Sequence, residues 1–378
     1  MMEDRLCVSG LSEAQLRTVV ESAVGRRVSA ISTSFHHRIT GHPGYRGEKC
    51  IPTFRCTASD GTRSEVTMFV KRLSHPEGGE TRQIAFLAGV GAPIPKLYGV
   101  LKDKDGHDIL FLEYLPIVYR DEDVYSNPDR LRRFLRLAAQ LNTLPLPRTD
   151  DVLPSHADLF KIPEAQISVL TDVAEHATGG NLGDELKRFF TGGAPVLPHL
   201  QQLLARLSTR VKSFPLGFVH GDFWPFHTGS RDDSQEILAI DLGCACLAPR
   251  FFDIAPFIGP PDTEANPCMR SEDVARAYLA EYNPKSGGST QLKEILLEAD
   301  AVWTAWNARR VPWLLESALK GEEEARVRMH WYLSILATWR EDRRLQSPYK
   351  LRARLAQAAV RPVDGASAVT PNRLRPEP

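Results

Sequence analysis

The first part of the chain alternates short apolar runs with turn-forming residues, a pattern typical of β-strands joined by hairpins. Apolar residues at helical spacing predict a helix over Leu11–Gly25. Strands are expected at Val28–Ser32, Ile51–Ala58 and Glu65–Leu73. Asp60-Gly61 between the last two strands indicates a hairpin. The stretch 34–49 is rich in glycine and histidine and lacks periodicity, so it is expected to be a long loop.

One more helix and a second hairpin complete this strand-rich part. The stretch Glu80–Gly89 carries apolar residues at helical spacing. Residues 96–115 form two apolar runs around Asp105-Gly106, which predicts two strands and a turn. The first 115 residues are therefore expected to form a strand-rich unit with one internal helix.

Beyond Pro116 the apolar residues lie three and four positions apart, as in helices that bury one face. Helices are predicted at Leu131–Leu141, Leu200–Val211, Ala275–Tyr282, Leu292–Ala308 and Met329–Arg344. The run Glu236–Leu242 is instead typical of a buried strand. Residues 361–378 are polar and rich in proline, which predicts a disordered tail. The pattern therefore favours an α+β protein with a mainly helical C-terminal part.

Composition narrows the class of protein. The 378 residues are 42% hydrophobic, enough for a substantial core, and the basic and acidic residues are equal at 47 each, so we expect neither nucleic acid nor a membrane as partner. No stretch approaches about eighteen uninterrupted apolar residues. Six scattered cysteines favour reduced thiols. We therefore expect a cytoplasmic protein, whose oligomeric state the sequence leaves open.

The segment HGDFWPFHTG contains the candidate chemistry, because it places Asp222 beside two aromatic residues and His227 five positions later. Asp222 and Asp241 each follow a short apolar run, so the two carboxylates can converge on one site. Phosphoryl transfer uses such a pair: one aspartate accepts the hydroxyl proton, and the other holds the magnesium ion that neutralises the nucleotide phosphates. Protein kinases have an asparagine at the position of His227, followed by D-F-G, where this chain has D-L-G.

Several motifs in series resemble the aminoglycoside phosphotransferase family, the small-molecule branch of the kinase-like fold. They are HGDFWPFH, AIDLG and PRFFDIA in the second half, and FVKRL and FLEYLP in the first. The resemblance runs from Val28 to Ile258 and implies a bilobal protein-kinase-like fold, with an antiparallel-sheet N-lobe and a mainly helical C-lobe. It places a nucleotide-binding lobe at residues 1–112, a hinge at 113–118 and a catalytic lobe at 119–360.

The same resemblance implies how ATP is held. Lys71 in FVKRL would bind the α- and β-phosphates, and Glu80 would orient the lysine by an ion pair. Backbone groups of Glu113 and Leu115 would bind the edge of the adenine. The glycines where a phosphate-binding loop is expected, Gly41, Gly44 and Gly47, do not have the spacing of a kinase loop and are equally typical of plain turns.

In the catalytic lobe, Asp222 would be the base, Asp241 the main Mg²⁺ ligand and Asp253 a brace for the loop. His227 stands where the family has asparagine. Imidazole suits Mn²⁺ or Zn²⁺ better than Mg²⁺, whereas an amide oxygen suits Mg²⁺. Three outcomes are open: His227 binds Mg²⁺ weakly, it binds Mn²⁺, or one tightly held ion suffices.

The resemblance implies an ATP-dependent phosphotransferase acting on a hydroxyl of a small molecule, with an aminoglycoside or other antibiotic, and hence antibiotic resistance, as the leading possibility. Sugars and amino alcohols such as choline stay open, because the acceptor pocket belongs to the segment with the least resemblance. A kinase-like protein that binds nucleotide without efficient catalysis is one alternative. A hydrolase with a metal pair on His220, Asp222, His227 and Asp241 is another.

Other conspicuous residues have ordinary structural interpretations. His220 is expected to be a buried histidine that holds the loop, and Cys244 and Cys246 are expected to face the core. Trp303, Trp306 and Trp313 have helical spacing typical of core residues. Acidic residues that could bind the amines of a cationic acceptor are Asp121, Glu122, Asp123, Glu298, Asp300 and Glu322 to Glu324.

Overall fold

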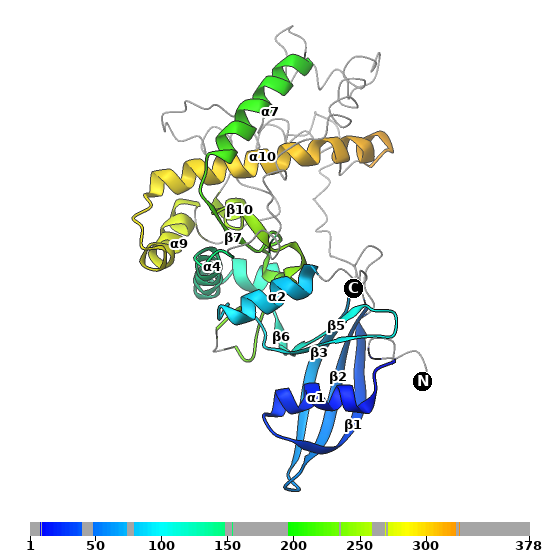
Figure 1. Cartoon of the computed structure of the whole chain (residues 1–378). Helices are drawn as coiled ribbons and strands as arrows, with labels where there is room; N and C mark the ends of the chain where they lie inside the picture. Colours follow the sequence, from blue (N-terminus) through cyan, green and yellow to red (C-terminus); the bar gives the residue numbers. More distant parts are fainter. Residues whose placement is uncertain are drawn as a thin grey trace, which may run out of the picture.

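The computed structural model describes residues 8, 10–39, 48–73, 79–147, 153, 196–233, 236–258, 269, 271–322 and 325. These residues form an antiparallel sheet followed by a mainly helical part (Figure 1). The chain is thus an α+β protein, as the apolar pattern predicts. No helix in the described ranges is long and apolar enough to cross a membrane.

The sheet has five strands in the order β1-β2-β3-β5-β4, and all neighbours run antiparallel. Its members are β1 (Val28–Ile39), β2 (Glu48–Ala58), β3 (Arg63–Arg72), β4 (Leu97–Lys102) and β5 (Asp108–Glu113). Both predicted hairpins are confirmed. In the β2–β3 turn the Asp60 carboxylate accepts the Thr62 N–H at 2.8 Å. In the β4–β5 turn Gly106 has a φ of 84°, which glycine adopts without strain.

Two helices cover opposite faces of the sheet, and their positions decide which way each strand residue points. The helix α1 (Glu13–Val24) packs Val19 and Val20 onto the face that carries Val70. The helix α2 (Gly79–Gly89) lies between the sheet and the helical part (Figure 1). Successive side chains of a strand alternate between faces, so Lys71, which follows Val70, points toward α2.

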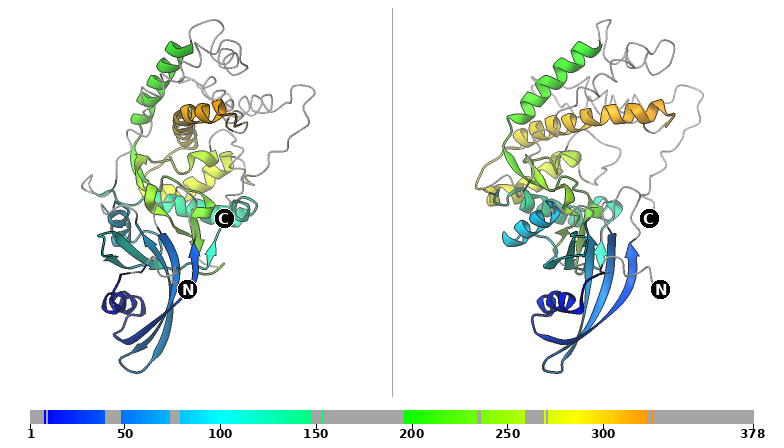
Figure 2. Two further views of the ribbon diagram at one scale, coloured as in Figure 1. Left: turned by 90° about the vertical axis from the view of Figure 1, so that its right-hand side faces the viewer. Right: turned by 45° about the vertical axis from the view of Figure 1, so that its right-hand side comes forward.

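The helical part contains α3 (Asp121–Tyr125), α4 (Pro128–Asn142), α7 (Val196–Lys212), α8 (Ala255–Ile258), α9 (Ser271–Ser286) and α10 (Leu292–Leu319). Asn127 caps the N-terminus of α4 by accepting the N–H groups of Asp129 and Arg130. The long helix α10 crosses beside α7 and α9 (Figure 2). Four predicted helices are confirmed here. The predicted helix Met329–Arg344 and the tail 361–378 lie outside the described residues.

Short strands and 3₁₀ turns build the centre of the molecule. The strand β7 (Leu216–Val219) pairs with β10 (Cys246–Pro249), and β8 (Thr228–Ser230) pairs with β6 (Ile117–Val118) and β9 (Leu238–Ala239). The 3₁₀ turns are η3 (Pro225–His227) and η4 (Leu242–Cys244). The loops that follow β7 and β9 contain Asp222 and Asp241 respectively, so these small sheets fix both carboxylates.

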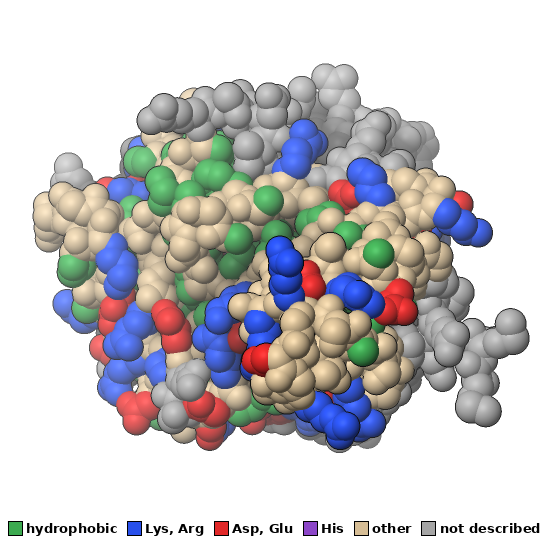
Figure 3. All heavy atoms as spheres, turned by 60° about the horizontal axis from the view of Figure 1, so that its bottom comes forward, with side chains coloured by type: hydrophobic (Ala, Val, Ile, Leu, Met, Phe, Trp, Pro, Cys, Tyr) green, Lys and Arg blue, Asp and Glu red, His purple; other side chains and the backbone are tan. Residues whose placement is uncertain are grey.

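Two element predictions are wrong in extent. Residues 34–39 were expected in a loop but continue β1, because they pair with β2 in the register Arg38 to Cys50, after a shift between Phe35 and His37. The predicted strand Glu236–Leu242 is reduced to Leu238–Ala239, because Asp241 adopts a left-handed conformation that ends the pairing. On the face in Figure 3, acidic and basic side chains are intermixed, in keeping with the equal charge counts.

Candidate active site

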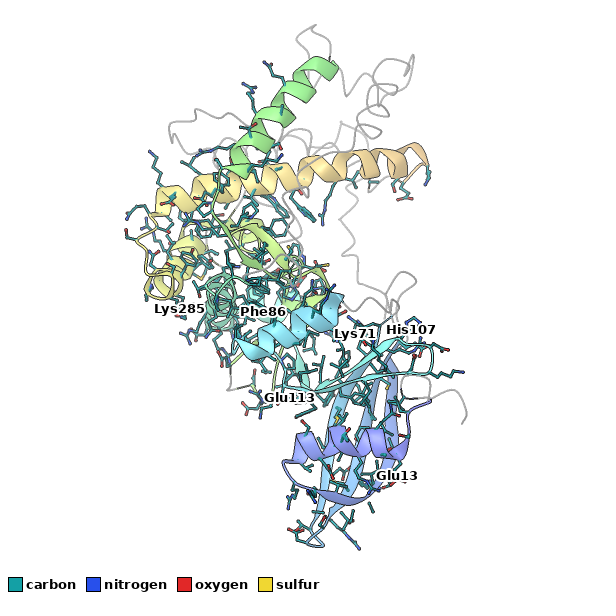
Figure 4. All side chains as sticks on the ribbon, in the orientation of Figure 1. Glu13, Lys71, Phe86, His107, Glu113 and Lys285 are labelled. Atoms are coloured by element: carbon teal, nitrogen blue, oxygen red, sulfur yellow. The ribbon has the colours of Figure 1, made fainter. Side chains whose placement is uncertain are left out.

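Lys71 joins the sheet to the helical part through two carboxylates. Its Nζ lies 2.7 Å from Glu80 Oε1 on α2 and 3.1 Å from Asp241 Oδ1 in the loop after β9. The Lys71 side chain is only 8% exposed, so burial opposes its charge, yet the two carboxylates raise its pKa above the usual value. Figure 4 shows Lys71 at the end of the sheet nearest α2. The lysine is therefore held charged and oriented at the junction.

Asp241 lies where several charges meet. Burial opposes its ionised form, but the positive charges of Lys71 and Lys49 outweigh burial and lower its pKa to about 2. Lys49 Nζ lies 3.6 Å from Asp241 Oδ2. With a φ of 56°, Asp241 is the one non-glycine residue of positive φ in the described ranges. Such a conformation persists only where its surroundings enforce it, and it is typical of functional sites.

Asp253 holds the loop after β7 in position through hydrogen bonds to the loop backbone. The buried Asp253 carboxylate accepts the backbone N–H of His220 at 2.7 Å and that of Gly221 at 3.0 Å. Asn142 donates to the same carboxylate at 3.2 Å. At Gly221 the φ is 81°, and an added Cβ would lie 2.2 Å from the Cys244 carbonyl oxygen, so only glycine fits. The predicted brace role of Asp253 is confirmed by these contacts.

His220 is fully buried and uses both ring nitrogens in the fold. Its Nε2–H donates to the Ile240 carbonyl at 2.8 Å, and its Nδ1 accepts the Asp222 N–H at 3.3 Å. Burial lowers the pKa of His220 to about 4, so the ring is neutral near pH 7. The prediction of a satisfied core histidine is confirmed. A metal could bind His220 only after one of these hydrogen bonds broke, which disfavours the metal-pair hydrolase.

His227 lies between the two catalytic candidates. Its Nδ1 is 2.7 Å from the Asp222 backbone carbonyl, which can only accept, so Nδ1 carries the proton. With the proton on Nδ1, the lone pair of an uncharged imidazole is on Nε2, and this atom lies 4.0 Å from Asp241 Oδ2. Nδ1 is also 3.4 Å from Asp222 Oδ2. The His227 ring therefore lies near both carboxylates, with Nδ1 close to Asp222 and Nε2 close to Asp241.

Asp222 keeps access to solvent, with 45% of its side chain exposed. Burial raises its pKa above the usual value, and the negative charge of Asp241 adds to this effect, while His227 and Arg310 oppose it. A carboxylate of raised pKa is the stronger proton acceptor. These properties make Asp222 a candidate general base.

The strand end at Glu113 connects the sheet to the segment that follows. The Glu113 carboxylate accepts two hydrogen bonds from Arg231, at 2.6 and 2.8 Å, beside the end of β8 (Figure 4). Its backbone N–H donates to the Lys96 carbonyl at 2.9 Å. The buried Leu115 follows, and in the described residues its backbone N–H has no hydrogen-bond partner. That N–H is available to an outside acceptor such as an adenine nitrogen.

The donor set around Asp241 fits a nucleotide-bound divalent ion. Mg²⁺ usually takes one or two protein carboxylates and completes its shell with phosphate oxygens and water. Asp241 and His227 Nε2 are two candidate ligands, and the described residues contain no group of three or more His, Cys, Asp or Glu side chains suited to a metal. Such a pair could hold an ion together with a triphosphate.

Other predicted residues have varied outcomes. Cys246 is buried, but Cys244 is exposed, because the chain turns through η4 instead of continuing as a strand; both are free thiols. Trp303 is buried and Trp306 packs against the core, whereas the side chain of Trp313 lies outside the described residues. Gly41, Gly44 and Gly47 also lie outside them.

Two further findings concern residues near the site. Glu298 bonds Arg250 and is not available as a separate amine-binding carboxylate. Lys49 was missed by sequence reasoning, although the β2–β3 hairpin contained the signal: extending the pairing of Thr53 with Thr67 outward pairs Lys49 with Lys71.

Comparison with known proteins decides the family. The model of the phosphotransferase enzyme family, abbreviated APH, matches residues 53–295, which is more than half of the chain. The chain belongs to this family. As a member of the phosphotransferase family, it contains within the matched range Lys71, Glu80, Asp222, His227 and Asp241, whereas Lys49 lies just before it. The resemblance drawn from the motifs is confirmed.

Solved structures of similar proteins include small-molecule kinases. A spectinomycin phosphotransferase in complex with ADP and spectinomycin is 13% identical, with a TM-score of 0.47 over 86% of this phosphotransferase and 98% of that chain. A choline kinase from Cryptosporidium parvum is 13% identical, with a TM-score of 0.47 over 81% and 89%. An ethanolamine kinase from Plasmodium vivax is 12% identical, with a TM-score of 0.46 over 88% and 82%. No curated protein sequence matches the chain.

Proposed function

We propose that this phosphotransferase transfers the γ-phosphoryl group of ATP to a hydroxyl of a small molecule. The observation that carries the proposal is the contact of Lys71 with Asp241 at 3.1 Å, together with His227, which lies between Asp241 and Asp222. In this assignment residues 1–112 and 119–360 are the two lobes, and 113–118 is the hinge. The lysine, the metal-binding carboxylate and the base then lie around one reaction centre.

On the nucleotide side, Lys71 binds phosphate oxygens of ATP, and its ion pair with Glu80 holds the ammonium group in place. The Leu115 N–H and the Glu113 carbonyl form hydrogen bonds to the adenine edge. Asp241 and His227 hold the divalent ion. When bound, that ion neutralises negative charge on the phosphates.

On the acceptor side, Asp222 receives the proton of the attacking hydroxyl. The acceptor oxygen forms a bond to the γ-phosphorus as the bond to the bridging oxygen breaks, and ADP leaves. Asp253 and His220 hold the Asp222 loop in position through buried hydrogen bonds. Asp222 therefore orients the hydroxyl and removes its proton, while the neighbouring residues prevent the loop from shifting.

An antibiotic, with resistance as the outcome, is the proposed acceptor class on the strength of the motif resemblance. Sugars and amino alcohols such as choline are the alternative acceptors, because the acceptor pocket belongs to the segment with the least resemblance to the family.

The test is an assay of ATP-dependent phosphate incorporation into a panel of hydroxyl acceptors: an aminoglycoside, spectinomycin, a macrolide, a hexose, choline and ethanolamine. We expect at least one acceptor to be phosphorylated and Asp222→Asn to lower that rate by about 10² to 10⁴. The exposed Asp129→Asn on α4 is the matched control and should leave the rate unchanged. Equal rates in Asp222→Asn and wild type would refute the role of Asp222. Consumption of no ATP with any acceptor, despite ATP binding, would favour the catalytically impaired alternative.

A further inference from the structure

A second lysine lies beside Lys71, and it comes from a different strand. Lys49 on β2 is directly opposite Lys71 on β3 in the antiparallel register. Both ammonium groups approach the same carboxylate, Lys71 at 3.1 Å from Asp241 Oδ1 and Lys49 at 3.6 Å from Asp241 Oδ2. The Lys49 side chain is 15% exposed. Asp241 therefore lies between two lysines.

This arrangement is costly for the folded protein on its own. Like charges directly opposite each other on neighbouring strands are destabilising, and partial burial removes the water that would screen them. Asp241 offsets part of this repulsion, but the same carboxylate is the candidate ligand for a divalent ion. An ion on Asp241 would leave two adjacent ammonium groups with less negative charge between them. A polyanion bound at this place would supply the missing charge.

We propose that Lys49 is a second phosphate-binding lysine, which binds phosphate oxygens of the nucleotide next to those bound by Lys71. The inference rests on the proposed function, because it requires ATP at this site. The strand pairing fixes Lys49 on the same face of the sheet as Lys71, so both ammonium groups reach one triphosphate. Lys49 thus adds a charged side chain to phosphate recognition. This chain has Gly41, Gly44 and Gly47 before Lys49, and they lack the spacing of a kinase phosphate-binding loop.

The test measures nucleotide binding to the full chain by calorimetry, with adenosine, ADP and ATP as probes. Lys49→Met should weaken ATP binding about tenfold or more, since charge-assisted contacts to phosphate are strong, and should leave adenosine binding unchanged. Lys49→Arg keeps the charge and should bind ATP within a few-fold of wild type. Lys293→Met, an exposed lysine at the start of α10, is the matched control and should bind as wild type does. Thermal unfolding shows whether each variant is folded.

A chelator separates direct phosphate contact from an effect through Asp241. If Lys49 binds phosphate, the loss in Lys49→Met persists when ATP is titrated in EDTA. If Lys49 only positions Asp241 for a metal ion, the loss disappears in EDTA, and the inference is wrong. ATP affinity within twofold of wild type in Lys49→Met, with a clear loss in Lys71→Met, would overturn the inference and leave the proposed function standing. Failure of the folded wild type to bind ATP would overturn both.

Discussion

His227 is the member of the candidate site that departs from the asparagine expected from the family resemblance. The asparagine expected here offers an amide oxygen, whereas His227 fixes its own tautomer by donating from Nδ1 to the Asp222 carbonyl. The lone pair on Nε2 is thereby directed toward Asp241. The same ring also couples the base loop to the candidate metal ligand. In the proposed site, this one side chain would therefore act both on the choice of metal ion and on the position of the loop.

We predict that His227 shifts the metal preference toward softer ions. In wild type, Mn²⁺ should support several-fold greater turnover than Mg²⁺, because imidazole nitrogen binds Mn²⁺ better than Mg²⁺. In His227→Asn the order should reverse. Binding of Mn²⁺ in the presence of ATP, followed by electron paramagnetic resonance, should weaken about tenfold in His227→Ala if one ligand is lost. Identical preference and affinity in all three proteins would exclude a ligand role.

The loop after β7 behaves as one element because three buried groups hold its backbone. Asp253 accepts two consecutive N–H groups, His220 bonds the Ile240 carbonyl, and Asn142 links Asp253 to the Tyr278 hydroxyl at 2.8 Å. Burial raises the pKa of Asp253 to about 6 and lowers that of His220 to about 4. Loop position is therefore linked to the protonation of groups that do not touch substrate.

These shifts predict a measurable dependence of stability on pH. The unfolded chain protonates His220 near pH 6.5, but the folded chain does so only near pH 4. The stabilisation from a neutral His220 is thus present above pH 6.5 and is lost as the pH falls toward 4, which amounts to about 3 kcal/mol. Asp253 has the opposite sign, since its contribution is lost as the pH rises toward 6, and it flattens the wild-type profile.

The difference between wild type and His220→Gln isolates the histidine, because both proteins retain Asp253. Urea unfolding at several pH values should show wild type losing about 3 kcal/mol relative to His220→Gln between pH 6.5 and 4. His107→Gln in the β4–β5 turn controls for histidine replacement and should not reproduce the effect. A constant difference across this range would contradict the assigned protonation of His220.

Local pattern predicted most elements of this fold, and the exceptions share a cause. The hairpins at Asp60-Gly61 and Asp105-Gly106 are specified by their own turn residues, so sequence reasoning locates them. Residues 34–39 lack strand-like composition, yet they pair with β2, a partner that composition does not reveal. Asp241 ends a run that reads as a continuous strand, because its left-handed backbone is imposed by the site.

The candidate site was predictable where a motif marked it. Lys71, Asp222 and Asp241 follow from motif order, and the structure brings their neighbourhoods together. Lys49 carries no motif, and its importance appears only once the register of β2 against β3 is known. Asn142 lies far from the loop in sequence but donates a hydrogen bond to Asp253. This contact depends on packing that no local pattern specifies.

In the whole molecule, contacts at the candidate active site join the sheet to the helical part. Lys71 contacts Asp241, Gln83 on α2 donates to the Ala245 carbonyl at 3.0 Å, and Arg231 bonds Glu113. All three contacts connect residues more than a hundred positions apart. Any change in the angle between the two parts would alter the distance from Lys71 to Asp241. Under the proposed function, nucleotide affinity should therefore depend on this junction.

The most direct test is calorimetric titration of Mg²⁺–ATP into wild type, Lys71→Met, Asp241→Asn and Asp222→Asn. We predict binding by wild type, and a loss of about tenfold or more in the Lys71 and Asp241 variants, since each removes a charged contact worth about 1.5–3 kcal/mol. Asp222→Asn should retain wild-type affinity, because the base acts on the acceptor. Absence of binding by the folded wild type, or affinity unchanged by both Lys71→Met and Asp241→Asn, would show that these residues do not form a nucleotide site.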